Sequence, residues 1–432
     1  MSNVSTRIHI KGGHLIDPTN DIDAVTDLWI ADGKVQSIAK VPDGFTADQI
    51  INAEQQIVCP GLIDLSARIR EPGQEHKATI ASETTAAAKA GITTLVCPPD
   101  TQPVIDSPAI VELIHLKARE AGMSHLHMLG ALTCNLGGEL ISEMHSLKEA
   151  GVLGMSNANQ PVPNSLILGR AFEYAATHDL TVFIRPDDNG LSDNGCVHES
   201  ALSSRLGLPG IPEAAETVAV ARHLELIEQT GVRAHFSQLS TARAANMIAR
   251  ARHDGLKVTA DVAIHHLYLT DIDIRDYNSA CHLIPPLRSE RDRDGLRDAL
   301  KQGVIDAICS DHQPHEPDAK QAPFPDTEPG MSGLDTLLPL VKRLADEKLL
   351  SLSEAIDRVT RLPANILGLD QGHLSVGANA DICIFDPDMS WGVSSDTLNS
   401  AGHNTPFIGW EMHGRATRTL VNGQLIFSTD HD

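Results

Sequence analysis

The chain has 432 residues, and its 34 Lys and Arg residues against 57 Asp and Glu residues give a formal net charge of −23. This balance argues against nucleic acid or an anionic membrane as a partner, because binding either one requires clustered Lys and Arg. A hydrophobic content of 41% and a charged content of 21% are typical of a globular protein and exclude disorder, collagen and coiled coil.

Short alternating segments characterise both ends of the chain. Residues 7–17 and 27–39 alternate apolar and polar side chains between Gly and Asp, and residues 380–387 and 417–427 repeat the pattern. Because isolated hairpins are only marginally stable, the strands at the two ends need partners. We therefore expect residues 1–59 and 370–432 to form one composite β-sandwich domain.

Residues 60–369 alternate short apolar runs with helical stretches, which is the pattern of parallel strands joined by crossover helices. Eight runs are typical of buried strands: residues 62–69, 92–98, 126–133, 152–157, 181–186, 233–238, 257–263 and 306–311. Amphipathic or Ala-rich helical stretches lie between several of them, at residues 82–91, 108–122, 139–151, 216–231 and 241–255. Eight such units predict an α/β chain with a (β/α)8 TIM-like barrel, whose functional site lies at the C-terminal ends of the strands. The alternative, a doubly wound open sheet, is disfavoured because no GxGxxG turn follows the first strand.

Cysteine usage and the N-terminal sequence indicate the compartment. The seven cysteines are scattered, odd in number and never spaced as CxxC, so neither a disulfide framework nor a zinc knuckle is expected. The first ten residues lack the apolar stretch of a signal peptide, and no apolar run reaches the roughly 18 residues of a membrane span. We expect a cytoplasmic protein.

Motifs distributed over nearly the whole chain resemble those of the dihydroorotases, which belong to the amidohydrolase superfamily. The segment GLIDLSARIREPG corresponds to the family's D-x-H-x-H-L-R-E-P-G strand, and CPPDTQP, GMSNANQPV, AHFSQLST and SDHQPH follow in the family's order and spacing. The resemblance implies the scaffold of a zinc-dependent hydrolase that opens or closes the dihydroorotate ring in pyrimidine biosynthesis. In such enzymes His and carboxylate ligands hold zinc and lower the pKa of a bound water.

Where the family has its metal ligands, this chain has mostly different residues. Ser66 and Arg68 replace the two histidines of the first strand, Asn157 replaces an aspartate, and Arg185 and Gln238 replace two further histidines, so that Asp311 alone is retained. A guanidinium offers only donors and stays protonated, so it repels a divalent cation. We therefore expect no zinc and no other cofactor. We expect instead an ion pair from Arg68 or Arg185 to Asp311.

The family's carboxylate-binding positions are altered as well. Arg70 and His315 remain, but Asp100 stands where the family has an asparagine. The negative charge of Asp100 would repel a substrate carboxylate, so we expect dihydroorotate to bind weakly or not at all. For Asp311, Arg70 and Arg185 we favour a structural role in ion pairs, with a site for an unknown anion as the alternative.

Two histidine pairs and one loop leave alternatives open. His125 and His127 form an H-x-H, but it precedes GALT on the third predicted strand and so lies toward the wrong end of the barrel for the family's zinc site. His265 and His266 follow the seventh strand, where a packing role is favoured over metal binding. Residues 316–333 are rich in Pro and acidic side chains, and they could form a lid, an interface loop or a solvated loop.

Together these features predict an enzyme scaffold without enzymatic activity. The sequence resembles the non-catalytic dihydroorotase-like chains of some bacteria, which assemble with the catalytic chain of aspartate carbamoyltransferase and support its activity. The resemblance implies an oligomeric, non-catalytic subunit of de novo pyrimidine (UMP) biosynthesis. The alternatives are an active zinc-dependent dihydroorotase, another cyclic amidohydrolase such as a hydantoinase, and a metal-free sensor of a pyrimidine intermediate.

Overall fold

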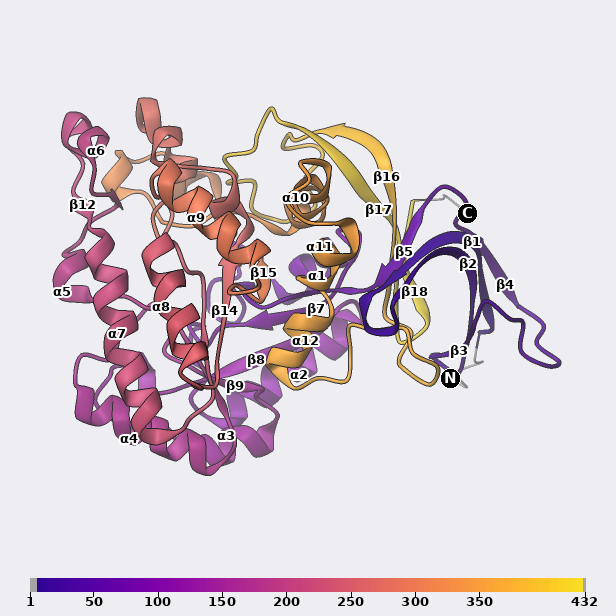
Figure 1. Cartoon of the computed structure of the whole chain (residues 1–432), viewed down its shortest axis with the longest axis horizontal. Helices are drawn as coiled ribbons and strands as arrows, with labels where there is room; N and C mark the ends of the chain where they lie inside the picture. The colour runs from indigo at the N-terminus through magenta and orange to yellow at the C-terminus, as the bar shows by residue number, and fades with distance from the viewer. Residues whose placement is uncertain (1–5, 430–432) are drawn as a thin grey trace.

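The structure, a computed structural model, describes residues 6–429. Residues 1–5 and 430–432, the outer ends of the two predicted terminal segments, lie outside the described residues. The described chain contains a barrel and a second, antiparallel-rich sheet that lies beside it (Figure 1).

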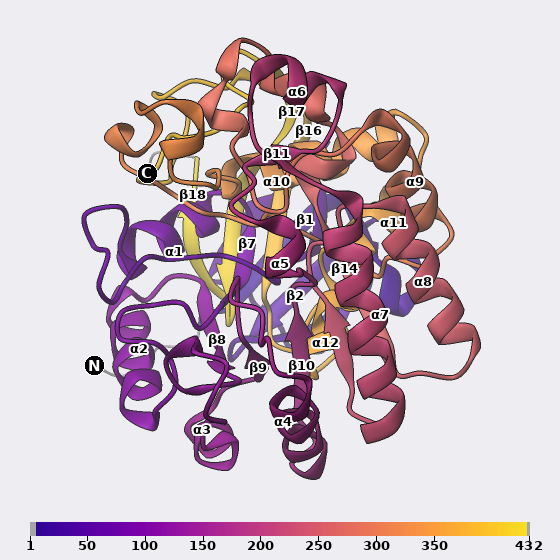
Figure 2. The ribbon, with the colours of Figure 1, turned by 90° about the vertical axis from the view of Figure 1, so that its left-hand side faces the viewer.

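Within the described residues, eight parallel strands form the predicted barrel (Figure 2). They are β6 (Leu62–Asp64), β7 (Ile92–Cys97), β8 (His125–Ala131), β9 (Gly154–Ser156), β10 (Thr181–Ile184), β13 (Ala234–Phe236), β14 (Val258–Ala263) and β15 (Ala307–Cys309). Seven lie inside predicted segments, and the eighth, β8, begins one residue before its segment. The strands pair in chain order, and a parallel bridge between Ala67 and His312 joins the segments that follow the first and last strands. The barrel prediction is confirmed.

Helices surround the barrel strands. The longer ones are α1 (Ile80–Lys89), α2 (Pro108–Ala121), α4 (Ser165–Thr177), α7 (Glu213–Thr230), α8 (Ala242–His253), α9 (Glu290–Lys301) and α10 (Leu334–Asp346). The shorter ones are α3 (Met144–Ala150), α5 (Asn189–Ser192), α6 (Ala201–Leu206), α11 (Leu352–Asp357) and α12 (Arg361–Leu367). The five predicted helical stretches correspond to α1, α2, α3, α7 and α8. A two-stranded insertion, β11 (Val197–His198) with β12 (Gly210–Ile211), follows β10.

Strands from the two ends of the chain share the second sheet. Its members are β1 (Ile8–Asp17), β2 (Ile22–Ala31), β3 (Lys34–Ile38), β4 (Gln49–Asn52), β5 (Ile57–Pro60), β16 (Ile382–Gly392), β17 (Glu411–Val421) and β18 (Gln424–Ser428). The N-terminal and C-terminal strands meet where β5 pairs antiparallel with β16, with Cys59 opposite Cys383. Inward side chains such as Ile10, Leu28 and Ile382 form a separate apolar core under this sheet.

Local sequence explains how α1 begins beside the barrel mouth. A capping box precedes the helix, because Thr79 Oγ1 accepts a hydrogen bond from Ser82 N while Ser82 Oγ accepts one from Thr79 N. The helix then buries Ile80, Glu83 and Ala87 on one face, which places a carboxylate among alanines. No helix in the range 6–429 is both long and apolar enough to cross a membrane.

Candidate functional site

The C-terminal ends of the barrel strands bring Arg68 between two carboxylates. Arg68 follows β6, and its Nε donates to Asp100 Oδ2 over 2.7 Å, while its Nη1 lies 3.5 Å from Asp311 Oδ1. The side chain is only 6% exposed. Burial alone would lower the pKa of Arg68, but the charges of Asp100 and Asp311 outweigh burial and raise that pKa. A permanent cation therefore occupies the place that the resemblance assigns to a metal-ligating histidine.

Asp311 follows β15 and is surrounded by donors. Besides Arg68, it accepts hydrogen bonds from Gln313 Nε2, at 3.1 Å to Oδ1 and 3.2 Å to Oδ2, and Ser66 Oγ lies 3.5 Å from Oδ1. Burial raises the pKa of Asp311 to about 6, although the positive charge of Arg68 opposes the shift. The expected ion pair between Arg68 and Asp311 is present, but the shorter contact of Arg68 is to Asp100.

Ser66 and Gln238 form a neutral hydrogen bond across the barrel mouth. Gln238 Nε2 donates to Ser66 Oγ over 2.7 Å, and Gln238 N donates to Asp261 Oδ1 over 2.6 Å. Asp261 also accepts a hydrogen bond from His235 Nε2 at 2.9 Å, so both oxygens of this buried carboxylate are hydrogen-bonded within the barrel. Asp64 is similarly engaged, because Ser310 N donates to its Oδ1 over 2.9 Å and ties the first strand to the last.

Asn157 faces the neighbouring loop, where its amide is fully used. Its Oδ1 accepts from Thr133 N at 3.2 Å and from Thr133 Oγ1 at 2.8 Å. Its Nδ2 donates to Leu136 O at 3.2 Å and to Gln160 O at 2.6 Å. The amide oxygen, which is the only atom of Asn157 that could bind a metal, is thus hydrogen-bonded to Thr133. The side chain joins the strand end to the neighbouring loop.

Arg185 follows β10 and pairs with a carboxylate other than the expected one. Its Nη2 lies 3.1 Å from Asp187 Oδ2, and no contact to Asp311 within ion-pair distance is present. Burial lowers the pKa of Arg185, although the charge of Asp187 acts in the opposite direction. Its Nε is buried and finds no hydrogen-bond partner among the described residues. Asp187 lies only two residues further along the chain, which explains this pairing, and of the two arginines considered for Asp311 it is Arg68 that contacts it.

The retained substrate positions are bonded to one another. Arg70 Nε donates to Pro314 O over 2.9 Å, and Arg70 Nη2 lies 3.0 Å from His315 Nε2. Lys77 Nζ lies 3.1 Å from Nδ1 of the same imidazole. Burial, together with the charges of Arg70 and Lys77, lowers the pKa of His315 to about 2, so this ring is neutral. Burial and the charge of Arg68 lower the pKa of Arg70 to about 10.

These side chains do not fit a zinc ion. Zinc needs His, Cys or carboxylate ligands at roughly 2.0–2.3 Å in a tetrahedral arrangement. The matching positions supply two guanidinium groups, a hydroxyl, two amides already hydrogen-bonded and one carboxylate already facing Arg68. Over residues 6–429, no three His, Cys, Asp or Glu side chains come together in a geometry that could hold a metal ion.

The space between these side chains is small. The cavity lined by Ser66, Arg68, Arg185 and Gln238 has a volume of about 30 Å³. One water molecule needs about 10–15 Å³ measured in this way, so the cavity has room for roughly two waters. Pockets that bind small organic ligands are typically about 300–1,000 Å³.

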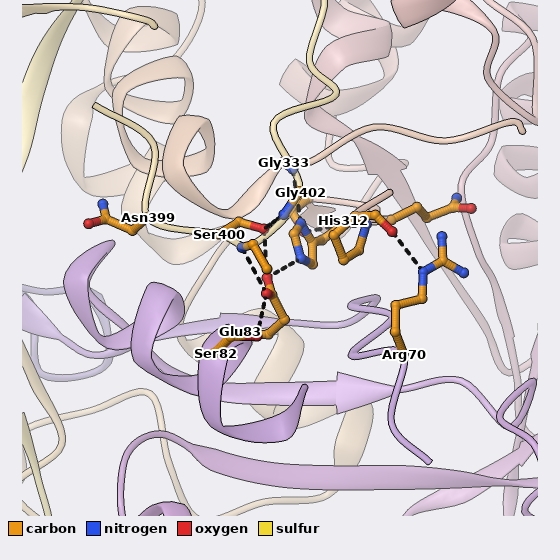
Figure 3. A network of polar contacts seen from close by, with 12 residues as sticks. Arg70, Ser82, Glu83, His312, Gly333, Asn399, Ser400 and Gly402 are labelled. Atoms are coloured by element: carbon orange, nitrogen blue, oxygen red, sulfur yellow. Dashed lines mark hydrogen bonds and ion pairs between the residues drawn. The ribbon is translucent and has the colours of Figure 1, made fainter. Parts of the chain in front are cut away.

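A buried network that sequence reasoning missed fastens the loop after the last strand (Figure 3). His312 Nδ1 accepts from Gly333 N at 3.1 Å, so the ring proton is on Nε2, which donates to Glu83 Oε2 over 2.8 Å. Ser400 Oγ donates to the same oxygen over 2.7 Å, and Ala401 N donates to Oε1 over 3.1 Å. Burial alone would raise the pKa of Glu83, but these hydrogen bonds and His312 hold it below its ordinary value.

The signal for this network was present in the sequence, as a lone glutamate on the alanine face of a predicted helix. The C-terminal segment adds further contacts to the same loop. Asn404 Nδ2 donates to Gln313 O and to Gly330 O at 3.0 and 3.1 Å. Gly402 approaches so closely that a Cβ there would lie 2.6 Å from the Cβ of Pro314. Residues 316–333, which contain the short 3-10 turns Pro317–Lys320 and Phe324–Asp326, are therefore tied to the C-terminal segment at Gly330.

The two histidine pairs lie outside the barrel mouth's polar cluster. His125 is the first residue of β8, at the end of the barrel remote from Asp311. His265 and His266 lie in a buried 3-10 turn after β14, and their ring centroids are 4.5 Å apart. Burial lowers the pKa of both rings, so both are neutral.

The architecture is that of the hydantoinase and dihydropyrimidinase barrels. L-hydantoinase (dihydropyrimidinase) from Arthrobacter aurescens matches with a TM-score of 0.87 at 22% identity, over 98% of this chain and 96% of that chain. D-hydantoinase from a Thermus species matches with a TM-score of 0.84 at 22% identity, over 98% and 95% of the two chains. At this level of identity the likeness establishes the fold alone.

Sequence relatives define the family within that class. A "Dihydroorotase-like protein" from Pseudomonas putida is 49% identical over 418 residues, which cover 97% of this chain and 98% of the relative. A protein of the same description from Pseudomonas aeruginosa is 48% identical over 97% and 99% of the two chains. A "Dihydroorotase" from Geobacter sp. (strain M21) is 42% identical over 97% and 98%. Residues 55–244 also match the dihydro-orotase-like family model. The chain belongs to the dihydroorotase family.

Proposed function

We propose that this chain is a catalytically inactive dihydroorotase-like subunit that assembles with the catalytic chain of aspartate carbamoyltransferase and supports that enzyme in de novo pyrimidine biosynthesis. The observation that carries the inactive part of the proposal is the position of Arg68 between Asp100 and Asp311. Its guanidinium supplies, from the protein itself, the positive charge that a metal would supply in a dihydroorotase.

Electrostatics argues against the hydrolytic chemistry of the family. Ring opening in a zinc hydrolase needs a metal-bound water whose pKa is lowered by the ion. Two buried guanidinium groups, Arg68 and Arg185, would repel a divalent cation, and the one carboxylate of the set already faces Arg68. Restoring a zinc site would require both arginine side chains to leave the barrel mouth.

The available space supports the same proposal. A cavity of about 30 Å³ holds roughly two waters, whereas a cyclic imide or amide of the size of dihydroorotate needs a pocket many times larger. Arg70 and His315 contact each other and the loop backbone, so neither is arranged as an open carboxylate site. This geometry also disfavours a metal-free sensor that would use Arg70, Arg185 and His315.

The partner rests on the family resemblance. The two Pseudomonas relatives at 49% and 48% identity carry the description "Dihydroorotase-like protein", while the Geobacter relative at 42% is a "Dihydroorotase". We assign this chain to the former group because its metal-ligand positions are replaced. A subunit that no longer needs an open barrel mouth can use its intact scaffold for assembly.

Two measurements test the two parts of the proposal separately. Gel filtration of this chain mixed with the aspartate carbamoyltransferase catalytic chain of the same organism should give one co-eluting peak, and omitting this chain should lower carbamoyl transfer. An unrelated barrel protein of similar mass serves as the control. Separate elution under all conditions, with unchanged carbamoyl transfer, would remove the assembly role and leave the inactivity proposal standing.

Metal content decides between the inactive subunit and the rival, an active zinc-dependent dihydroorotase or related cyclic amidohydrolase. Protein purified from zinc-supplemented cells should contain far less than one zinc per chain by inductively coupled plasma mass spectrometry. It should also leave dihydroorotate and hydantoin unopened. Stoichiometric zinc together with ring opening would overturn the inactive assignment.

A further inference from the structure

A second cleft lies away from the barrel mouth, between the barrel and the sheet built from the chain ends. Its volume is about 820 Å³, within the range of small-molecule pockets. It is lined by α2, by the start of β8, by the turn between β2 and β3, and by the turn between β17 and β18. The dihydroorotase chemistry discussed above makes no use of this end of the barrel.

Cationic and imidazole side chains from three elements converge on this cleft. Lys34 comes from β3, His115 and Arg119 come from α2, and His125 and His127 come from β8. Among the described residues of the lining, Asp32 is the single acidic one. Leaving the histidines aside, Lys34 and Arg119 against Asp32 give a local charge of 2 − 1 = +1, in a chain whose overall charge is −23.

Several of these groups have unused hydrogen-bonding capacity. The side chains of His115, Arg119 and His127 have no hydrogen-bond or ion-pair partner within residues 6–429, while Lys34 Nζ meets only the exposed Gly377 O, at 3.2 Å. His125 Nε2, by contrast, lies 3.2 Å from Asp381 Oδ2, which orients that ring beside His127. The ring centroids of His125 and His127 are 6.5 Å apart.

Burial disfavours the charged forms of His115 and His127, and no carboxylate among the described residues contacts either ring. Burial lowers the pKa of His127 to about 4, with His125 and His115 adding to the shift. Burial also lowers the pKa of His115, and the charge of Arg119 acts in the same direction. Lys34, His115, Arg119 and His127 thus bring hydrogen-bond donors into the cleft, and no carboxylate of the described residues is bonded to any of the four side chains.

We infer that this cleft binds a phosphorylated small molecule, with the phosphate held by Arg119, Lys34 and the imidazole of His127. A phosphate monoester carries a charge of about −1.5 to −2 at neutral pH and offers three acceptor oxygens, which suits donors that converge from separate elements. The amides of Asn379, Asn422 and Gln424 line the rest of the cleft and suit the polar remainder of the molecule. The site is independent of the proposed function, and either can fail without the other.

Isothermal titration calorimetry on the full chain tests this inference with four probes. Inorganic phosphate and ribose 5-phosphate separate a free ion from a phosphate ester, pyrophosphate tests a higher charge, and succinate tests a dicarboxylate. We expect saturable binding of ribose 5-phosphate and pyrophosphate and none of succinate. Saturation by inorganic phosphate alone, equal binding of succinate, or flat traces for all probes up to about 10 mM would overturn the proposal.

Variants locate the site. Arg119 is exposed and unpaired, so Arg119→Gln should fold normally and weaken pyrophosphate binding about tenfold, the usual effect of losing one charge-assisted hydrogen bond. Arg170→Gln is the matched control, because Arg170 is exposed on α4, outside the cleft lining, and should leave binding unchanged. Pyrophosphate should also shift the ring NMR resonances of His115 and His127. Equal affinity in the wild type and in Arg119→Gln, or resonances of these rings that do not move on saturation, would contradict the assignment.

Discussion

Replacing Asp311 by asparagine isolates the energetic role of the carboxylate that remains at the end of the last barrel strand. Asp311 is 3% exposed and accepts hydrogen bonds from Gln313 on both oxygens. In Asp311→Asn the amide oxygen can keep the contacts that Oδ1 makes with Arg68 and Gln313. Only the 3.2 Å contact from Gln313 to Oδ2 is lost. Arg68 stays neutralised, because its shorter ion pair is with Asp100.

The expected size of the effect follows from the pKa of Asp311. Burial raises this pKa from 3.8 to about 6, against the opposing charge of Arg68. At about 1.36 kcal/mol per pKa unit, ionising Asp311 costs the native state about 3 kcal/mol relative to the unfolded chain. Because the native pKa is the higher one, the corresponding stability is complete below about pH 4 and is lost as pH rises through about 6. Asp311→Asn should therefore raise the free energy of unfolding at neutral pH, by at most about 3 kcal/mol.

Urea unfolding followed by circular dichroism, at pH values from about 4 to 8, measures this difference. The gain of Asp311→Asn over the wild type should be largest at pH 7–8 and should vanish toward pH 4. Asp100→Asn is the matched control with the opposite sign, since it removes the shorter partner of the buried Arg68. A variant Asp311→Asn that is less stable than the wild type at pH 7, or a gain that does not depend on pH, would refute the reasoning.

Three further perturbations follow from the same cluster. Arg68→Met should lower the free energy of unfolding, measured in urea at neutral pH, by about 3–5 kcal/mol, because Asp100 and Asp311 would lose their cation. Adding Asp311→Asn to this variant should recover part of the lost stability. Glu83→Gln should lower the free energy of unfolding by about 1–3 kcal/mol in the same assay, because the new amide nitrogen would face the donor of His312 or of Ala401. The control Glu120→Gln, at an exposed position of α2, should have no effect. Zinc uptake, detected by mass spectrometry, is expected of a chain that combines Ser66→His, Arg68→His, Asn157→Asp, Arg185→His and Gln238→His. If this variant folds but takes up no zinc, loop geometry as well as ligand identity excludes the metal.

The barrel could be predicted from the sequence because its signal is local and repeated. Buried parallel strands appear as short apolar runs between helical stretches, and each of the eight runs overlaps one barrel strand. Placing Ser66 and Arg68 at the barrel mouth needed only the alternation of side chains along an extended segment. The contact between Arg68 and Asp311 followed from their charges once both were placed at the same end of the barrel.

The choice of ion-pair partner could not be predicted in the same way. An arginine side chain reaches several carboxylates, so its partner depends on rotamers and loop positions that no local pattern specifies. Arg185 pairs with Asp187, two residues further along the chain, and the shorter ion pair of Arg68 is with Asp100, whose position in the sequence suggested only an effect on substrate binding. The cleft lined by Lys34 and His127 could not be predicted from the sequence either, because it depends on how two distant segments pack.

The altered residues at the barrel mouth are consistent with one another as a replacement for a metal. Asp100 and Asp311 would be costly to bury without a cation, and Arg68 alone, without carboxylates, would be equally costly. Together they neutralise much of the charge in a space too small for a substrate. The contacts from Glu83 and Asn404 anchor the start of the following loop, at His312 and Gln313 next to Asp311. The contacts that join these barrel ends thus come from the chain's own side chains, which is the arrangement that the proposed non-catalytic subunit requires.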